Sequence, residues 1–396
     1  MENKLTKMYL RLCSVSVFSN VIERPLFKAF EEYCSRPSND VYGKMKSYAK
    51  FVCEIYKNGA SLTELVSALV FEDENVYVKS RAKGIELDGH IVKSARRELE
   101  IFSAFAAISP EDFAEDMGVS KSDIPQFGSF IKPLGGAYEE RIQQIGKYGY
   151  GIFASYGMFR ISDDKQIEPI LSADKIETQS FIGYEEERNK VLENTLAFVE
   201  GRPAANTLLC GDAGTGKSST VKAVANKFFD KGVRLIELRK DQLSLLPYVM
   251  GKISENPLKF IIFIDDLAFN RSDDNFSMLK AALEGSASAK SDNAVIYATS
   301  NRRHIIKESF SDREGDDVHI NDTMQELLSL SERFGLVVLF SKPDKKLYLE
   351  IVHSLAKQND IKLNAKELDV QAEAFALKKG NRSARCAQQF IESLLR

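Results

Sequence analysis

The chain has 396 residues, of which 44% are hydrophobic and 28% are charged. This length exceeds what one hydrophobic core usually supports, so we expect two or three domains. The composition excludes collagen-like and largely disordered chains. The formal net charge is −3 and neither half of the chain is basic, so nucleic acid stays open as a partner but has no support from charge.

The five cysteines are scattered and form no CxxC pair, which is typical of reduced thiols in a cytoplasmic protein. No run of about 18 apolar residues occurs, and lysine and arginine interrupt the N-terminal segment. We therefore expect a cytoplasmic protein without a membrane span or a signal peptide.

Residues 1–170 are expected to form a mostly helical domain whose role the sequence does not reveal. Ser61 and Glu64 have capping-box spacing ahead of apolar residues at helical intervals, and residues 91–107 predict a second helix with an apolar face. Pro25 is typical of a helix start. Residues 146–159, rich in glycine and aromatic residues, predict a short strand or a connector between domains.

Residues 171–341 are expected to form an α/β core, and residues 342–396 a helical lid. Short apolar runs that alternate with helical segments predict a parallel sheet covered on both faces. Helices are expected in the lid as well. The expected strands are residues 207–210, 233–238, 260–264, 294–298 and 336–340, and the expected lid helices are 347–355, 367–379 and 383–395.

A phosphate-binding loop follows the first of these strands and precedes an amphipathic helix. Its glycines let backbone amides turn toward phosphates, and the positive end of the helix dipole adds to their field. Lys217 is expected to reach the β- and γ-phosphates of ATP, and the hydroxyl of Ser218 to bind Mg²⁺. The nucleotide-binding residues of this loop are Gly211, Asp212, Ala213, Gly214, Thr215, Gly216, Lys217, Ser218 and Ser219.

Two more strands end in polar side chains. Residues 260–264 lead into Asp265 and Asp266, and residues 294–298 lead through Thr299 to Asn301. We predict that Asp265 holds Mg²⁺ and that Asp266 orients or deprotonates the attacking water. The acidic pair also fits a turn or a helix cap, and Asn301 is equally typical of a turn after a strand.

These segments, with residues 331–335 and 380–385 after them, resemble the AAA+ ATPases in order and spacing. More narrowly, Asn194-Thr195, residues 201–206 and residues 298–304 resemble a bacterial AAA+ family catalogued as a domain of unknown function. The resemblance is strong from about residue 181 to the C-terminus. It implies an AAA+ P-loop NTPase fold with a parallel sheet, a C-terminal helical lid and a helical N-terminal domain.

The resemblance also implies roles that spacing alone does not give. Asn301 would be the sensor-1 residue, and Arg333 an arginine finger that reaches the ATP of a neighbouring subunit, which implies a homo-oligomer. Arg385 would be the lid's sensor-2 arginine, with Arg382 as its rival. Phe181 and Ile182 would pack near adenine.

Three functional hypotheses remain open. The first is an ATPase that hydrolyses ATP with Mg²⁺ at a site shared between subunits and remodels or loads a protein partner. The second is an ATP-gated nucleic-acid loader, favoured because no aromatic pore loop follows residues 233–238. The third is a weakly hydrolysing nucleotide switch, because Asp266 stands where Glu is the more familiar residue.

Overall fold

The computed structural model describes residues 4–171, 183–267, 279, 283, 292–301 and 333–395, so that Phe181 and Ile182 lie outside the described residues. The chain divides into two compact units. The first is Met1–Ser155 with Glu255–Pro257, and the second is Tyr156–Ser254 with Leu258–Arg396. Within the described ranges no helix is both long and apolar enough to cross a membrane.

The described part of the first unit is helical, and its helices begin where the sequence offers caps. Pro25 is the first residue of α3, and the Ser61 side chain accepts a hydrogen bond from the Glu64 amide at the start of α5. The helix predicted at residues 91–107 is α7, capped by Asp88. The α-helices are α1 (Lys4–Leu12), α2 (Ser19–Ile22), α3 (Pro25–Cys34), α4 (Val41–Tyr56), α5 (Leu62–Glu72), α6 (Val76–Ala82), α7 (Gly89–Ala106), α8 (Pro110–Met117), α9 (Leu134–Gln143) and α10 (Ile145–Tyr148), with short 3₁₀ turns at Lys121–Asp123 and Gly151–Ala154.

Aromatic side chains fill the core of this unit. Phe30, Phe51, Phe105 and Phe113 are fully buried. Phe105 and Phe113 each contact both Phe30 and Phe51, with ring centroids 5.0–6.3 Å apart. Such contacts stabilise the packing beyond the burial of apolar area.

A seven-stranded sheet forms the centre of the second unit. Its strand order is β2-β1-β4-β5-β6-β3-β7, and every neighbouring pair is parallel except β1 and β2. The sheet already includes residues 158–169, so it begins before the expected domain boundary at residue 170. The strands are β1 (Met158–Ile161), β2 (Ile167–Pro169), β3 (Thr207–Gly211), β4 (Val233–Leu238), β5 (Lys259–Ile264), β6 (Ala294–Ser300) and β7 (Leu336–Phe340).

The five strands predicted from apolar runs are confirmed, and their register determines where their polar ends meet. β6 lies between β3 and β5, with Cys210 opposite Ser300 and Ile264 opposite Ala298. Because all three strands are parallel, the residues that follow them emerge at the same edge of the sheet. The loop after Gly211, the acids after Ile264 and the polar end of β6 are therefore neighbours.

Helix α11 (Glu185–Val199) is anchored to the sheet by a buried polar cluster. Asn194 Nδ2 donates to the Ala205 carbonyl at 2.9 Å and to the Tyr297 hydroxyl at 3.0 Å, and Thr195 Oγ1 lies 2.7 Å from that hydroxyl. This explains the Asn194-Thr195 pair as a structural anchor. The other helices beside the sheet are α12 (Lys217–Lys227) and α13 (Leu246–Ile253), with 3₁₀ turns at Phe229–Lys231 and Lys240–Leu245.

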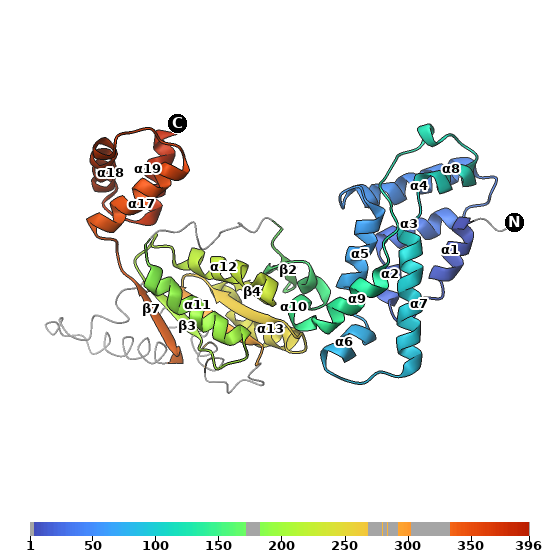
Figure 1. Ribbon diagram of the computed structural model, residues 1–396, viewed down its shortest axis with the longest axis horizontal. Helices are drawn as coiled ribbons and strands as arrows, with labels where there is room; N and C mark the ends of the chain where they lie inside the picture. The colour runs from blue at the N-terminus through green and yellow to red at the C-terminus, as the bar shows by residue number, and fades with distance from the viewer. Residues whose placement is uncertain are drawn as a thin grey trace. The chain divides into compact units, whose positions relative to one another are not determined.

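The predicted lid consists of three helices with a core of their own, drawn in red in Figure 1. They are α17 (Lys345–Gln358), α18 (Ala365–Lys379) and α19 (Ala384–Leu394). Tyr348 is fully buried between them and donates a hydrogen bond to the Ala372 carbonyl at 3.1 Å.

Candidate nucleotide site

The phosphate-binding loop requires glycine at its first residue. Gly211 has φ +133°, and a Cβ atom there would collide with the carbonyl oxygen of Phe340 on β7. Gly214 has φ +78°, and an added Cβ would lie 3.1–3.3 Å from Ser383 and Arg385 of the lid. The loop thus packs closely against both β7 and the start of α19, which leaves no room for larger residues at these two positions.

Lys217, the first residue of α12, is only 5% exposed. Its Nζ atom donates to the carbonyls of Gly211 and Asp212 at 3.0 and 2.7 Å, and to Asn301 Oδ1 at 2.9 Å. Burial lowers the pKa of the Lys217 ammonium, because a charged group loses hydration there. The loop therefore holds a cation in a position that an anionic ligand would stabilise.

The hydroxyl of Ser218 at the start of α12 lies beside the carboxylate of Asp265, which directly follows β5. The Ser218 hydroxyl donates to Asp265 Oδ1 at 2.6 Å, and the Thr299 hydroxyl donates to the same oxygen at 2.5 Å. Hydroxyl and carboxylate oxygens are the ligands that Mg²⁺ prefers. The donor set therefore suits a magnesium ion, and Thr299 fixes the orientation of the carboxylate.

Asp266 and Asn301 meet in the same place. Asn301 Nδ2 donates to Asp266 Oδ1 at 2.7 Å, and the Asp266 amide donates to the Thr299 hydroxyl at 2.9 Å. Asp266 has φ +53°, in the left-handed region. Asp and Asn adopt this conformation far more readily than most residues, which gives a local reason for Asp where Glu was the more familiar expectation.

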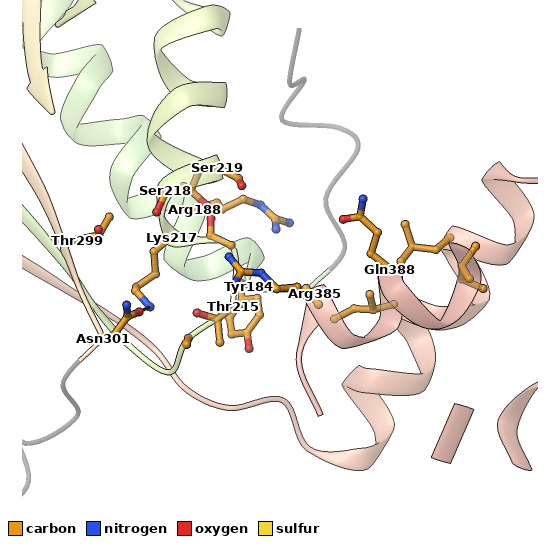
Figure 2. Close-up of a pocket in the computed structure, with 18 of the residues that line it drawn as sticks. Tyr184, Arg188, Thr215, Lys217, Ser218, Ser219, Thr299, Asn301, Arg385 and Gln388 are labelled. Carbon is orange, nitrogen blue, oxygen red and sulfur yellow. Dashed lines mark hydrogen bonds between the residues drawn. The ribbon is translucent and has the colours of Figure 1, made fainter. Parts of the chain in front are cut away.

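A cavity of about 870 Å³ opens beside these residues, within the size range of ligand pockets. One wall is the phosphate-binding loop with Asp265, Asp266 and Asn301, and the other is the lid. Figure 2 shows Lys217 pointing toward Asn301, whereas Arg385 and Gln388 extend from the lid. The apolar lid residues of the wall are Ile351, Leu355, Ile391 and Leu395.

The structure separates the two lid arginines. Arg385 lines the cavity, and its backbone amide donates to the Gly214 carbonyl at 3.3 Å. Arg382 instead forms a two-pronged ion pair with Glu373 of α18, at 3.0 and 2.8 Å. Of the rival candidates, Arg385 is thus the one placed at the cavity.

Arg333 is not among the described residues that line the cavity. It precedes β7, whereas the loop residue Gly211 lies opposite Phe340 at the far end of that strand. Gly335 and Phe340 are five residue steps apart, which is about 17 Å in an extended strand. Arg333 therefore lies near the opposite edge of the sheet from its own phosphate-binding loop.

The sequence reasoning missed Arg188, which lines the cavity from α11 and is 8% exposed. Its guanidinium donates to Glu185 Oε1 at 3.2 Å, and this oxygen also accepts from the Gly183 amide at 3.0 Å. Burial lowers the pKa of Arg188. No motif marks this position, although an arginine on an otherwise buried helix face was a signal available in the sequence.

The sheet, the loop and the lid define the class: this is an AAA+ P-loop NTPase fold. The chain belongs to the family described as "Protein of unknown function (DUF815)", whose model matches residues 154–396. No curated protein matches the sequence.

Among solved structures, the fold is similar to Thermotoga maritima RuvB, described as the Holliday junction branch migration motor, at 15% identity and a TM-score of 0.33. That likeness covers 56% of this chain and 72% of the other. Two substituted forms of the same protein match at 14% identity, with TM-scores of 0.35 and 0.34, over 56% and 55% of this chain and 72% of each of theirs. The likeness is distant, and nothing about activity follows from it.

Proposed function

We propose that this protein binds ATP with Mg²⁺ in the cavity beside the phosphate-binding loop and hydrolyses it. The observation that carries the proposal is one connected set of hydrogen bonds, from Lys217 through Asn301 to Asp266. These bonds join Lys217, the cation expected to contact the phosphates, to Asp266, the acid expected to act on the attacking water.

The loop would hold the triphosphate. The backbone amides at the start of α12 carry the positive end of the helix dipole, and Lys217 adds a full charge beside them. Phosphate oxygens would replace the carbonyl and amide oxygens that now accept from Lys217 Nζ. The roles of Phe181 and Ile182 beside adenine stay predictions.

Magnesium would bind to Ser218 and, directly or through water, to Asp265. When bound, Mg²⁺ neutralises charge on the β- and γ-phosphate oxygens. The chain supplies the two oxygens 2.6 Å apart and a third residue, Thr299, that keeps the carboxylate turned toward Ser218.

Asp266 would accept the proton of the attacking water, and Asn301 would orient that water or contact the γ-phosphate. Both side chains line the cavity. In this arrangement the amide of Asn301 keeps Asp266 aimed at the phosphate-binding side, and a general base positioned in this way contributes about 10²- to 10⁴-fold in rate.

Arg333 would complete the site of a neighbouring subunit in a homo-oligomer. Its location before the start of β7 supports this, because from there it cannot reach the phosphates bound by its own loop at the other end of that strand. An arginine beside the γ-phosphate neutralises the charge that develops during phosphoryl transfer. Arg385 would act from the lid of the same subunit.

We infer a protein partner that ATP hydrolysis remodels or loads. The alternative of an ATP-gated nucleic-acid loader predicts DNA binding that weakens steeply with salt. A weakly hydrolysing switch predicts tight nucleotide binding with turnover near zero. A pull-down with the Asp266→Asn variant, loaded with MgATP, is expected to retain the partner for identification.

Phosphate release by the purified full chain tests the activity itself. We expect turnover with MgATP that is lost when EDTA removes Mg²⁺. In the absence of Mg²⁺, Ser218→Ala should bind ATP about as well as the unchanged chain does. Added Mg²⁺ should increase the ATP affinity of the unchanged chain but not that of Ser218→Ala. Phosphate release that persists in EDTA, or no binding of ATP at all, contradicts the proposal.

A further inference from the structure

Tyr184 lies where the cavity, the sheet and the connection to the lid meet. It directly precedes α11, and its side chain is part of the cavity wall. The Tyr184 hydroxyl donates to the Ser341 carbonyl at 2.6 Å, and its ring centroid lies 5.3 Å from that of Phe340. Phe340 is the last residue of β7, and Ser341 begins the connector from β7 to the lid. One tyrosine therefore joins the wall of the cavity to the base of the lid.

The connector is short, so a restraint on its first residue also restrains the lid. It consists of residues 341–344, between the end of β7 and the start of α17. Pro343 within it is buried, and proline has a fixed φ angle. Gly183, the neighbour of the tyrosine, packs against Leu347 of α17, where an added Cβ atom would collide with the leucine side chain. Few rotatable bonds thus separate the Ser341 carbonyl from the first lid helix.

The backbone of Tyr184 also indicates a role for its side chain. Its φ angle is +60°, in the left-handed region, and it follows Gly183 with φ +74°. Glycine or asparagine adopts this conformation at lower cost than a bulky aromatic residue. Unfavourable backbone conformations of this kind are concentrated at functional sites. A tyrosine at this turn is therefore explained best by the bonds that its ring and hydroxyl make.

The lid carries Arg385 to the other side of the cavity. The Arg385 amide donates to the Gly214 carbonyl at 3.3 Å, and a Cβ atom added to Gly214 would lie 3.2 Å from the Arg385 Cβ. Within the lid, the Tyr348 hydroxyl of α17 lies 3.9 Å from the Sγ atom of Cys386, the residue after this arginine. Figure 2 shows Arg385 extending from the lid toward the side of the cavity where Tyr184 lies. The place of Arg385 therefore depends on how α17 is held.

We propose that Tyr184 is a positioning residue, whose hydrogen bond to the Ser341 carbonyl holds the lid so that Arg385 stays at the nucleotide cavity. This inference rests on the proposed function and adds to it the way in which the lid is fixed. Tyr184 acts through Arg385, so its contribution to nucleotide binding exists only while that arginine is present.

Calorimetric titration of MgATP into the full-length protein measures the contribution. Tyr184→Phe removes only the hydroxyl and should lower the affinity about 3- to 10-fold, as expected for one lost hydrogen bond. The matched control is Tyr56→Phe in the first unit. It removes a tyrosine hydroxyl that also donates to a carbonyl, that of Gln126, at 2.6 Å, and it should leave the affinity unchanged. Equal affinities in Tyr184→Phe and the unchanged chain overturn the inference.

A double-mutant cycle separates positioning from direct contact with the nucleotide. If Tyr184 acts through the lid arginine, Tyr184→Phe should cause no further loss of MgATP affinity in the Arg385→Ala chain. If Tyr184→Phe lowers the affinity by the same factor with and without Arg385, the two residues act independently and the inference is wrong. A loss in Tyr184→Phe without one in Arg385→Ala also contradicts it.

Hydrogen exchange follows the lid in the absence of nucleotide. The Arg385 amide is protected by its bond to the Gly214 carbonyl, so Tyr184→Phe should speed exchange severalfold at the start of α19. Exchange in α18 should not change, because its bonds lie within the lid. Faster exchange throughout the lid would indicate a loss of stability and contradict a positioning role. Unchanged exchange at the start of α19 contradicts it as well.

Two further outcomes are decisive. If Tyr184→Phe does not fold, Tyr184→Asn replaces it, because asparagine suits the left-handed backbone; the same results support or overturn the inference. An unchanged chain that binds no MgATP contradicts the proposed function itself. An unchanged chain that binds MgATP, with variants of Tyr184 that bind it equally well, contradicts only the role of Tyr184.

Discussion

Lys217 Nζ donates a hydrogen bond to Asn301 Oδ1 at 2.9 Å, which links the phosphate-binding loop to the end of β6. The same amide donates through Nδ2 to Asp266 on the other side. Since β6 lies between β3 and β5 in the sheet, Asn301 at its end bridges the loop lysine and the acid with these two hydrogen bonds. A change at the phosphates can therefore reach Asp266 through a single side chain.

Lys217→Ala should abolish measurable ATP binding, because the backbone amides alone cannot neutralise the phosphate charge. Calorimetry with MgATP measures this. The control is Lys222→Ala on the same helix, which removes a lysine paired with Glu237 at 3.1 Å outside the described cavity wall and should bind normally. ATP affinity that survives in Lys217→Ala at a normal melting temperature would refute the site.

Asp266→Asn should bind ATP normally and lose turnover by about 100-fold or more, since the amide cannot accept a proton. Asn tolerates the left-handed backbone at this position, so the fold should be unchanged. Phosphate release at saturating MgATP measures the effect, with the exposed Asp241→Asn as the control. If turnover is unaffected, Asp266 is not the base.

Arg385→Ala should weaken MgATP binding or turnover roughly tenfold or more, through loss of a cation at the cavity. Arg382→Ala is its matched control three residues away, because Arg382 pairs with Glu373 within the lid. We expect Arg382→Ala to lower the melting temperature and to affect turnover much less than Arg385→Ala does. The assignment of the lid arginine would be reversed if Arg382→Ala had the larger effect on turnover.

ATP affinity should fall in alkaline solution. Burial lowers the pKa of Lys217 below its ordinary value of 10.5, and bound phosphate raises that pKa by stabilising the ammonium. Affinity is therefore full below the pKa of the free protein and is lost as the pH rises through it. Titrations at increasing pH measure the fall. Lys217→Arg keeps its charge at every pH used, so any ATP binding that remains in this variant should not weaken as the pH rises. An equal fall in affinity in that variant would contradict the explanation.

Much of the fold could be predicted because strong local patterns agree with it. The run of residues 260–264 is entirely apolar, and it forms the buried part of β5. β1 and β2 have only four and three residues, too few for periodicity to show that they extend the sheet. The sheet consequently begins earlier than the expected domain boundary.

Some residues of the candidate site could likewise be predicted from local patterns, whereas others depend on how the chain folds. The loop and Asp265 follow from motif and spacing, and the structure brings them together with Thr299. No motif marks Arg188, and its place in the cavity depends on how α11 packs against Tyr297. The local pattern shows only an arginine on an otherwise buried helix face. The left-handed backbone of Asp266 also arises from the path of the chain beyond β5.

The central claim is an ATPase site completed between subunits, and mixing two inactive variants tests it most directly. Arg333→Ala keeps an intact pocket and lacks the finger, while Lys217→Ala keeps the finger and lacks ATP. A finger supplied by a neighbour contributes roughly 10³- to 10⁵-fold in GTPases, so each variant alone should be nearly inactive. Phosphate release should partly return when the two are mixed and allowed to exchange subunits. A mixture that stays inactive, together with wild-type specific activity that does not change with protein concentration, would contradict the shared site.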